Sequence, residues 1–326
     1  MDTILVTGAT GFLGSHIISS LVESGFDVRA YSRQIFKPGM TAITCPLKWK
    51  QGELDQQCRL NAACDGVDAV VHCAGIADSN TNDLETLLRF NSEGTKNVFL
   101  AAANSQVKKF LYMSSVHASS PTVSYYSRSK SEAELFLCSD EAAKYSIQRF
   151  ILRLGNVYGP GMRGNLMTLL RLIQKRRLPP LPRLNSHLAL VGVDDLCQAI
   201  MRMAEQASSQ HSGPAVATGP DNVPVYPVTD GQTYQLKDIE LGIRRALAQK
   251  EPGWALPVSV CYCGVLVAEI LGRLLPWKNV PGLRTWRTMT RDQCVDDSKT
   301  RDQLSYNPRS NFYDALPLII QHETRQ

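Results

Sequence analysis

The residues best suited to chemistry are a tyrosine and a lysine four positions apart, Tyr126 and Lys130, in the segment YYSRSK (125–130). Residues four apart share one face of a helix, and Tyr126 has the lysine as its i+4 partner whereas Tyr125 has Ser129. A nearby ammonium favours the phenolate, so it moves the tyrosine pKa, ordinarily about 10, towards neutral pH. Tyr126 is therefore predicted to exchange a proton with a substrate hydroxyl or carbonyl.

A short-chain hydroxyl that orients the reacting oxygen would complete such a site. The segment KFLYMSS (109–115) reads as a strand ending in two serines, Ser114 and Ser115, and either one fits this role. His117 follows two residues later. It is either an accessory proton donor or, as is more usual for such a residue, a side chain that only shapes the pocket.

Three glycines near the start of the chain, Gly8, Gly11 and Gly14, follow an apolar stretch (3–7) and open an amphipathic one (12–23). Glycine lets the backbone turn sharply and approach a pyrophosphate closely. The N-terminus of the helix then offers unpaired N–H groups and a favourable dipole to the anion. This arrangement predicts a bound dinucleotide, so the proton exchange at Tyr126 would accompany hydride transfer to or from a nicotinamide.

Strand-like and helical patterns alternate through the first half of the chain. Strands are expected near 3–7, 27–31, 42–45, 69–73, 109–113 and 147–153, and helices near 12–23, 53–63, 84–103, 126–143 and 162–176. Such alternation predicts an α/β fold, a Rossmann-type doubly wound parallel sheet with crossover helices on both faces. The pattern changes near residue 155. We therefore expect an NAD(P)-binding domain over 1–154 and a smaller C-terminal substrate-binding lobe over 155–326, partly interwoven with it.

Five motifs, in order, resemble those of the extended short-chain dehydrogenase/reductase superfamily, in particular its NAD-dependent epimerase/dehydratase family. They are TGATGFLG (7–14), HCAG (72–75), NSEGTKNV (91–98), LRLGNVYGP (152–160) and VDDL (193–196).

The resemblance assigns roles to several positions. It favours Ser115 over Ser114 as the third catalytic residue beside Tyr126 and Lys130, although Ser119-Ser120 stands where the family usually has Tyr-Gly. The residues that it implies around the cofactor are Gly8, Thr10, Gly11, Phe12, Leu13, Gly14, Ser32, Arg33, Cys73, Ala74, Gly75, Asn91 and Lys130.

The end of the second strand bears on which dinucleotide is bound. Proteins specific for NAD place an acidic residue there to accept hydrogen bonds from the ribose 2′-hydroxyl. Here the position holds Ser32 and Arg33, and Asp27 lies too far back in the strand. A guanidinium can pair with a 2′-phosphate. We therefore expect NADP, with NAD as the alternative.

The substrate is less well defined. By resemblance, Asn156, Asn165 and Leu166 would face it, and His117 would border it because it follows Ser115 by two residues. A helix N-terminus beside Asn165 suits a nucleotide diphosphate, and helix capping by Asn165 explains the residue equally well. Against a nucleotide, Leu188 and Ala189 occupy the stretch before VDDL in which nucleotide-sugar enzymes of the family usually carry an arginine.

A nucleotide-sugar epimerase, dehydratase or reductase is the slightly favoured hypothesis. The alternative is a ketoreductase or hydroxysteroid-type dehydrogenase acting on an apolar alcohol or ketone. A catalytically inactive NAD(P)-binding regulator is disfavoured because Ser115, Tyr126 and Lys130 are all present. By the same resemblance we expect a homodimer formed through the helices that carry Asn91 and Tyr126.

Composition limits the remaining options. The net charge of +5, from 35 basic and 30 acidic residues, is too small to indicate nucleic acid. Nine cysteines without CxxC spacing predict reduced, buried thiols, and the scattered histidines argue against a metal site. No signal peptide is expected, which favours a cytoplasmic location. Pro257, Glu269 and Arg273 interrupt the apolar segment 255–277, so we expect a helix capping the lobe, with contact to a membrane surface as the minority alternative.

Overall fold

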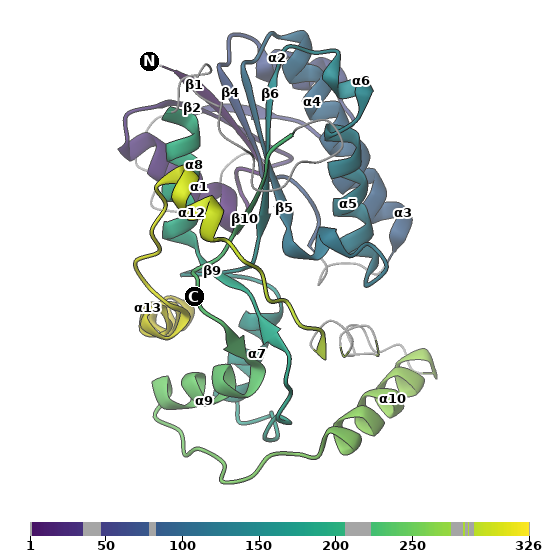
Figure 1. Cartoon of the computed structure of the whole chain (residues 1–326), viewed down its shortest axis with the longest axis vertical. Coiled ribbons are helices and arrows are strands. Elements are labelled where there is room, and N and C mark those ends of the chain that lie inside the picture. The colour runs from purple at the N-terminus through teal and green to yellow at the C-terminus, as the bar shows by residue number, and fades with distance from the viewer. Residues whose placement is uncertain are drawn as a thin grey trace.

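A seven-stranded parallel sheet forms the centre of the computed structural model, which describes residues 2–34, 47–77, 83–205, 223–274, 283, 286 and 290–325 (Figure 1). Its strand order, β10-β6-β5-β4-β1-β2-β3, is that of a Rossmann-type sheet. Successive strands are added on one side of β1 as far as β3 and then on its other side from β4 onwards. The strands are β1 (Thr3–Thr7), β2 (Asp27–Ser32), β3 (Lys48–Gln51), β4 (Ala69–His72), β5 (Lys109–Ser115), β6 (Gln148–Leu154) and β10 (Val225–Val228). The strand predicted at 42–45 lies outside the described residues.

Helices cover both faces of this sheet, as the alternating pattern predicts (Figure 1). One face carries α1 (Phe12–Glu23), α8 (Val193–Glu205) and α12 (Ser298–Leu304). The other carries α2 (Gln57–Cys64), α4 (Gly94–Asn104), α5 (Tyr125–Leu137) and α6 (Asp140–Ala143). Each face has its own apolar core, since the sheet between them is buried on both sides.

Two of the expected helices are interrupted. The stretch expected as one helix over 84–103 is α3 (Leu84–Leu87), a π-helical turn (Leu88–Glu93) and α4. The stretch expected over 126–143 ends at Leu137 because Ser139 caps a separate short helix, α6, by accepting a hydrogen bond from the Ala142 N–H. The first interruption has a consequence for the active site described below.

A smaller lobe lies beyond the carboxyl ends of the strands (Figure 1). It consists of α7 (Asn165–Gln174), α9 (Leu236–Ala246), α13 (Phe312–Thr324) and two pairs of short strands, β7 (Asn156–Tyr158) with β9 (Leu190–Gly192) and β8 (His187–Leu188) with β11 (Tyr234–Gln235). Its core is formed by residues such as Leu170, Ile239 and Phe312.

The second half of the chain also builds part of the central layer. Strand β10 pairs with β6 at the edge of the sheet, with Val225 opposite Ile151, and α8 packs on α1. The lobe and the sheet are therefore woven together by the chain.

Helix α10 (Val258–Leu274) projects from the lobe (Figure 1). The helix forms where the sequence predicts one, but none of its residues from 258 to 270 is buried, so the expectation that it caps the lobe is wrong. No helix in the described part of the chain is long and apolar enough to span a bilayer. The expectation of buried thiols is also only partly correct, because Cys58, Cys263 and Cys294 are exposed and Cys45 lies outside the described residues.

Candidate active site

The glycine turn between β1 and α1 is built for close approach. Gly8 has a φ of +70°, and a Cβ at that position would lie 2.8 Å from backbone atoms of Ala74. A Cβ on Gly14 would lie 2.3 Å from the Gly8 carbonyl oxygen. Gly11 is the N-cap of α1, where no side chain caps the helix and no acidic residue occupies the first turn. The N–H groups of this helix end are thus left to an anion, which is what a dinucleotide pyrophosphate requires.

The other residues predicted to contact the dinucleotide, in the glycine turn, in α1 and at the end of β2, differ from one another in burial and in neighbours. Leu13 lines the large cavity described below, whereas Phe12 packs against the lobe core and Thr10 is half-buried in the turn. At the end of β2, Ser32 is buried and its hydroxyl donates to the Gln34 carbonyl. Arg33 is exposed, with its guanidinium carbon 5.9 Å from the centre of the Phe90 ring.

A cavity of about 310 Å³ lies between the carboxyl edge of the sheet and the lobe. Every residue predicted to be catalytic or to face the substrate lines it, together with two of the predicted cofactor residues from the end of β4. They are Ser115, His117, Tyr126, Lys130, Asn156, Asn165, Leu166, Cys73 and Gly75. Residues separated by up to 93 positions in the sequence are therefore brought to one place.

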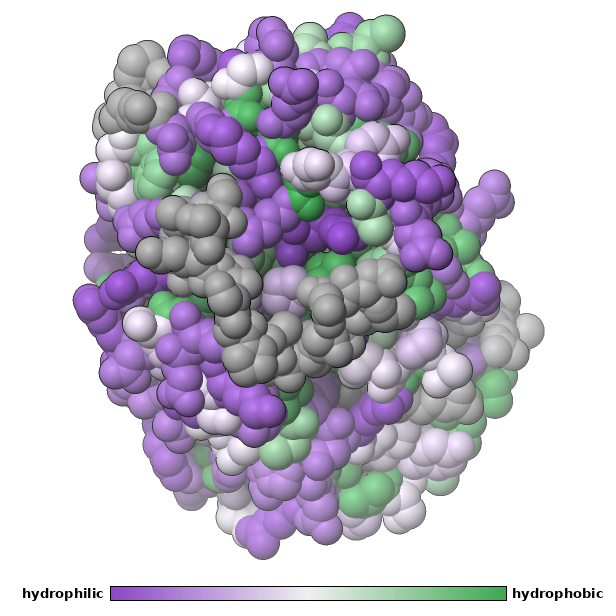
Figure 2. Space-filling view, turned by 45° about the horizontal axis from the view of Figure 1, so that its top comes forward, coloured by the Kyte–Doolittle hydropathy of each residue, from purple (hydrophilic) through white to green (hydrophobic). Residues whose placement is uncertain are grey.

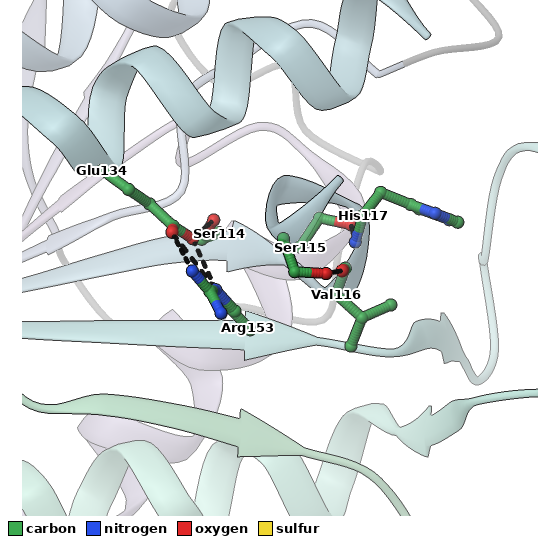
Figure 3. Close-up of polar contacts among 7 residues, drawn as sticks. Ser114, Ser115, Val116, His117, Glu134 and Arg153 are labelled. Carbon is green, nitrogen blue, oxygen red and sulfur yellow. Dashed lines mark hydrogen bonds and ion pairs between the residues drawn. The ribbon is translucent and has the colours of Figure 1, made fainter. Parts of the chain in front are cut away.

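Ser114 and Ser115 have different partners, although both border the cavity (Figure 3). Ser114 donates its hydroxyl hydrogen to Glu134, and Glu134 in turn accepts three hydrogen bonds from the Arg153 guanidinium, the shortest being 2.6 Å. Ser115 lies at the start of a 3₁₀ turn, where its Oγ accepts from the His117 N–H at 3.3 Å. Among the described residues, none accepts the hydroxyl hydrogen of Ser115, so this hydrogen is available to a molecule in the cavity.

Lys130 is buried on α5, one helical turn after Tyr126. Its Nζ donates to the Met113 carbonyl at 2.8 Å and lies 4.8 Å from the centre of the Tyr112 ring. Burial lowers the pKa of Lys130 to about 8, while Cys73 and Glu134 act in the opposite direction. The ammonium is therefore held beside the cavity at a pKa close to neutral pH.

Asn91 lies behind the cavity, in the π-helical turn, and joins two of its walls. Its Oδ1 accepts from the Ile76 N–H at 2.7 Å, and its Nδ2 donates to the Ile76 carbonyl at 3.0 Å and to Ser129 Oγ at 2.9 Å. These bonds tie the loop after β4 to the helix that carries Tyr126 and Lys130. A Cβ on Gly75 would lie 2.9 Å from Asn91 Oδ1, which explains the glycine.

His72 is a member of this assembly to which the sequence assigned no role, although it begins the HCAG motif. It is fully buried at the end of β4, with Nδ1 2.7 Å from Thr7 Oγ1 and Nε2 3.0 Å from Thr95 Oγ1. The Thr95 hydroxyl donates its hydrogen to the Asn91 carbonyl at 2.6 Å, so Thr95 Oγ1 must accept a hydrogen bond from His72 Nε2. The neutral His72 ring therefore carries its hydrogen on Nε2. Burial lowers the pKa of His72 to about 3, and the ring is neutral. It clamps β1 to the turn that holds Asn91.

The substrate side of the cavity is formed by α7 and the strands around it. Gly164, with a φ of +88°, is the N-cap of α7, and no side chain caps this end. Asn165 is the first residue of the helix, so the alternative that it serves as the cap is wrong. Arg163 is exposed beside it and also lines the cavity, a cation that the sequence reasoning missed.

Asn156 and Gln293 meet on the same side. Asn156 Nδ2 lies 3.3 Å from the Ala189 carbonyl and 3.2 Å from Gln293 Oε1, donating to both. Gln293 lines the cavity from a position 137 residues later in the chain, and no local pattern in the sequence could have indicated it.

His117 lies within the 3₁₀ turn (Val116–Ser119) that Ser115 precedes. Burial and the nearby Arg291 guanidinium lower its pKa, so the ring is neutral around pH 7. Arg291 itself donates to Ser120 Oγ at 2.7 Å and holds the loop that follows. A neutral imidazole in this position can accept or donate a hydrogen bond but does not add charge to the cavity.

Comparison with known proteins agrees with this geometry. Residues 4–219 match the model of the NAD dependent epimerase/dehydratase family. A UDP-glucose 4-epimerase of Vibrio cholerae is 26% identical over 98% of this chain and 94% of its own, and a decarboxylating sterol-4-alpha-carboxylate 3-dehydrogenase of Dictyostelium discoideum is 23% identical over 97% and 99%.

Among solved structures, a UDP-glucuronic acid 4-epimerase from Bacillus cereus superimposes with a TM-score of 0.74 over 99% of both chains at 19% identity, which establishes likeness of fold. The family model covers well over half of the sequence, and the glycine turn and the Tyr126–Lys130 pair lie within it. The chain is therefore an enzyme of the NAD dependent epimerase/dehydratase family.

Proposed function

We propose that this enzyme is a nucleotide-sugar epimerase, dehydratase or reductase. The observation that carries the proposal is that Ser115, Tyr126 and Lys130 line the same cavity as the uncapped N-terminus of α7 with Arg163. The cavity thus has groups for proton exchange and groups that can bind a phosphate.

The chemistry follows from these residues. The nicotinamide cofactor, when bound in the glycine turn, supplies the hydride acceptor or donor. Tyr126 exchanges the proton at the reacting oxygen of the sugar, and Ser115 donates a hydrogen bond to that oxygen and orients it. Lys130 supplies the positive charge that favours the tyrosinate and a donor for the cofactor ribose.

A nucleoside diphosphate fits the part of the cavity lined by the start of α7. The first N–H groups of α7 have no intrahelical partners, and Arg163 adds a positive charge at the same place. The V. cholerae relative is named for UDP-glucose, and the B. cereus structure holds UDP-glucuronic acid. Both names support a uridine diphosphate sugar as the first substrate to test.

One observation favours the second candidate, an apolar alcohol or ketone. Leu166, Leu169, Leu188 and Leu236 all line the cavity, and the D. discoideum relative is named for a sterol substrate. Nucleotide-sugar enzymes of the family usually carry an arginine in this stretch to contact the nucleotide, and this chain has Leu188 there.

Titration calorimetry with UDP distinguishes the two. Wild type should bind UDP, and Arg163→Ala should weaken binding by about 1 to 3 kcal/mol because a charged phosphate loses a partner. Arg183→Ala, which removes an exposed arginine of the lobe that does not line the cavity, is the matched control and should bind normally. Failure to bind UDP, GDP or dTDP, together with turnover of hydrophobic ketones, would establish the second candidate.

Turnover tests the catalytic assignment separately. With a nucleotide sugar that the enzyme converts, Tyr126→Phe should lower kcat by roughly two to four orders of magnitude and leave cofactor binding intact. Tyr125→Phe should remain active. The reverse pattern would show that Tyr125 is the proton donor.

We further propose that the cofactor is NADP. The end of β2 presents Arg33 at the surface and no carboxylate, which suits a 2′-phosphate. Fluorescence titration of both dinucleotides should give tighter binding of NADP, and Arg33→Ala should weaken NADP binding while NAD binding barely changes. Tighter binding of NAD by the wild type would refute this specificity.

A further inference from the structure

Helix α10 carries an apolar surface that the rest of the described molecule does not cover. Val260, Val267 and Ile270 lie on one side of it with 52%, 55% and 55% of their surface exposed. A Cβ placed on Gly264 would meet nothing within 4 Å. Large exposed apolar side chains of this kind are unusual on the surface of a protein that works alone in water.

Charge is almost absent along this surface. No charged residue occurs from 252 to 268, and the first one in α10, Glu269, accepts a hydrogen bond from the Leu283 N–H at 2.8 Å. The opposite side of the helix is only partly covered: Glu269 bonds to Leu283 there, and the Tyr262 ring lies 6.1 Å from that of Trp286 while 42% of Tyr262 stays exposed. The helix therefore has a protein-facing side and an outward side, and the outward side is apolar.

Cations lie near the start of the segment and in its last turn, although Glu251 and Glu269 directly flank the charge-free stretch. Lys250 precedes it, and Arg183 lies near its start, because the Leu256 N–H donates to the Pro180 carbonyl at 3.4 Å. Both are exposed, and neither forms an ion pair with another residue in the described ranges. Arg273 belongs to the last turn of α10. Residues 155–326 contain 20 basic and 15 acidic residues, so the whole net charge of +5 belongs to this half.

An apolar helix bordered by cations fits the surface of an anionic bilayer. At 17 residues, α10 is about 25 Å long, and it does not meet the requirements of a membrane-spanning helix. It is suited instead to lie in the plane of the interface, with its apolar side among the acyl chains and the cations near lipid phosphates. A second copy of the chain fits less well, because it would bring a second excess of positive charge to the same place.

Figure 2 shows how hydrophilic and hydrophobic residues are distributed over one face of the molecule. Hydrophilic residues predominate, and hydrophobic residues come to the surface in separate patches, several of them towards the lower right, the side on which α10 lies in Figure 1. We propose that the outward side of α10, with Val260, Val267 and Ile270, docks the enzyme on the surface of an anionic membrane.

This proposal does not depend on the substrate and can be tested by vesicle flotation. Wild type should float with vesicles of phosphatidylcholine and phosphatidylglycerol, and less so with phosphatidylcholine alone or at high salt. The double variant Val260→Glu/Val267→Glu should lower the bound fraction at least about tenfold, since two carboxylates would have to enter the interface. Leu318→Glu, at an apolar position of α13 that is 61% exposed, is the matched control and should float like wild type.

Three results would overturn the proposal: no flotation of wild type with anionic vesicles, flotation of the double variant at the wild-type level, or a wild-type oligomer that the double variant dissociates in light scattering. The last would assign the surface to a second copy of the chain. Equal unfolding temperatures and equal dinucleotide binding of the three proteins show that a loss of flotation does not come from misfolding.

Discussion

Two adjacent serines at the end of β5 show how a single residue's surroundings decide its use. Side chains alternate along a strand, so Ser114 and Ser115 point to different sides. On one side Ser114 meets a buried carboxylate, Glu134, paired with Arg153. Ser115 also borders the cavity, but its Oγ only accepts a hydrogen bond, from the His117 N–H.

The two serines should therefore respond differently to loss of the hydroxyl. Ser115→Ala should lower kcat roughly a hundredfold with little change in stability, because it removes a donor to the reacting oxygen. Ser114→Ala should keep most of kcat and lower the free energy of unfolding by about 1 to 3 kcal/mol, because Glu134 loses a buried partner. Steady-state kinetics and chemical denaturation of both variants measure this, and a larger loss of kcat in Ser114→Ala would reverse the assignment.

The depressed pKa of Lys130 predicts a pH dependence. Because the folded-state pKa is about 8 and the ordinary value is 10.5, the unfolded chain binds more protons between these two values. The contribution of Lys130 to the free energy of unfolding therefore rises with pH across this window and is least favourable below pH 8. Binding runs the other way: below about pH 8 the ammonium is charged, so affinity for the dinucleotide should fall as pH rises through that value.

Fluorescence titration of the dinucleotide across this range measures the effect. Lys130→Met should bind weakly at all pH values and show no inflection near 8. An inflection that persists in Lys130→Met would have to be assigned to another group.

At the scale of elements, the sequence predicted those parts that depend on local pattern. Apolar runs such as 3–7 and 109–113 became β1 and β5, and the glycine spacing placed the turn before α1. The π-helical turn at Leu88–Glu93 was missed, because it differs from an α-helix in hydrogen bonding and not in residue type. The partners of Ser114 were also out of reach, since Glu134 and Arg153 come from other elements 20 and 39 residues later.

Helix α9 provides a prediction at the same scale. Glu240 is fully buried and pairs with Lys237 at 2.9 Å and Arg244 at 2.8 Å, and it accepts the Leu181 N–H at 2.9 Å. Glu240→Ala leaves two buried cations without their partner, so the free energy of unfolding should fall by about 3 to 5 kcal/mol. Denaturant unfolding measures it. Asp238→Ala, on the exposed side of the same helix, should change stability little, and an equal loss there would contradict the argument.

At the scale of the whole molecule, the predicted boundary near residue 155 does not divide the chain into two separate structural units. The glycine turn and the HCAG motif, which the sequence predicts to bind the dinucleotide, lie before it. Yet Leu196, Ile200 and Met203 of α8 belong to the same core as Ile17 and Leu21 of α1, and β10 completes the sheet. Such long-range pairing leaves no local signal in sequence, because a four-residue strand such as VYPV is too short to be recognised alone.

A fragment ending at residue 154 should therefore fail to fold on its own. It would expose one face of the sheet and the unpaired edge of β6, both prone to aggregation. The full chain should unfold cooperatively on heating, and fragment 1–154 should show no such transition and should precipitate. A soluble, cooperatively unfolding fragment that binds the dinucleotide would contradict this.

The position of β10 also has a consequence for biosynthesis. When the ribosome has made β6, its outer edge stays open until Val225–Val228 emerges, roughly 74 residues later. At about 5 to 20 residues per second, the nascent chain waits on the order of 4 to 15 s with a strand edge uncovered. During that interval a chaperone that shields strand edges could bind the exposed edge of β6. Because slower translation lengthens the interval, slowing translation across residues 155–228 should raise the aggregated fraction of newly made enzyme.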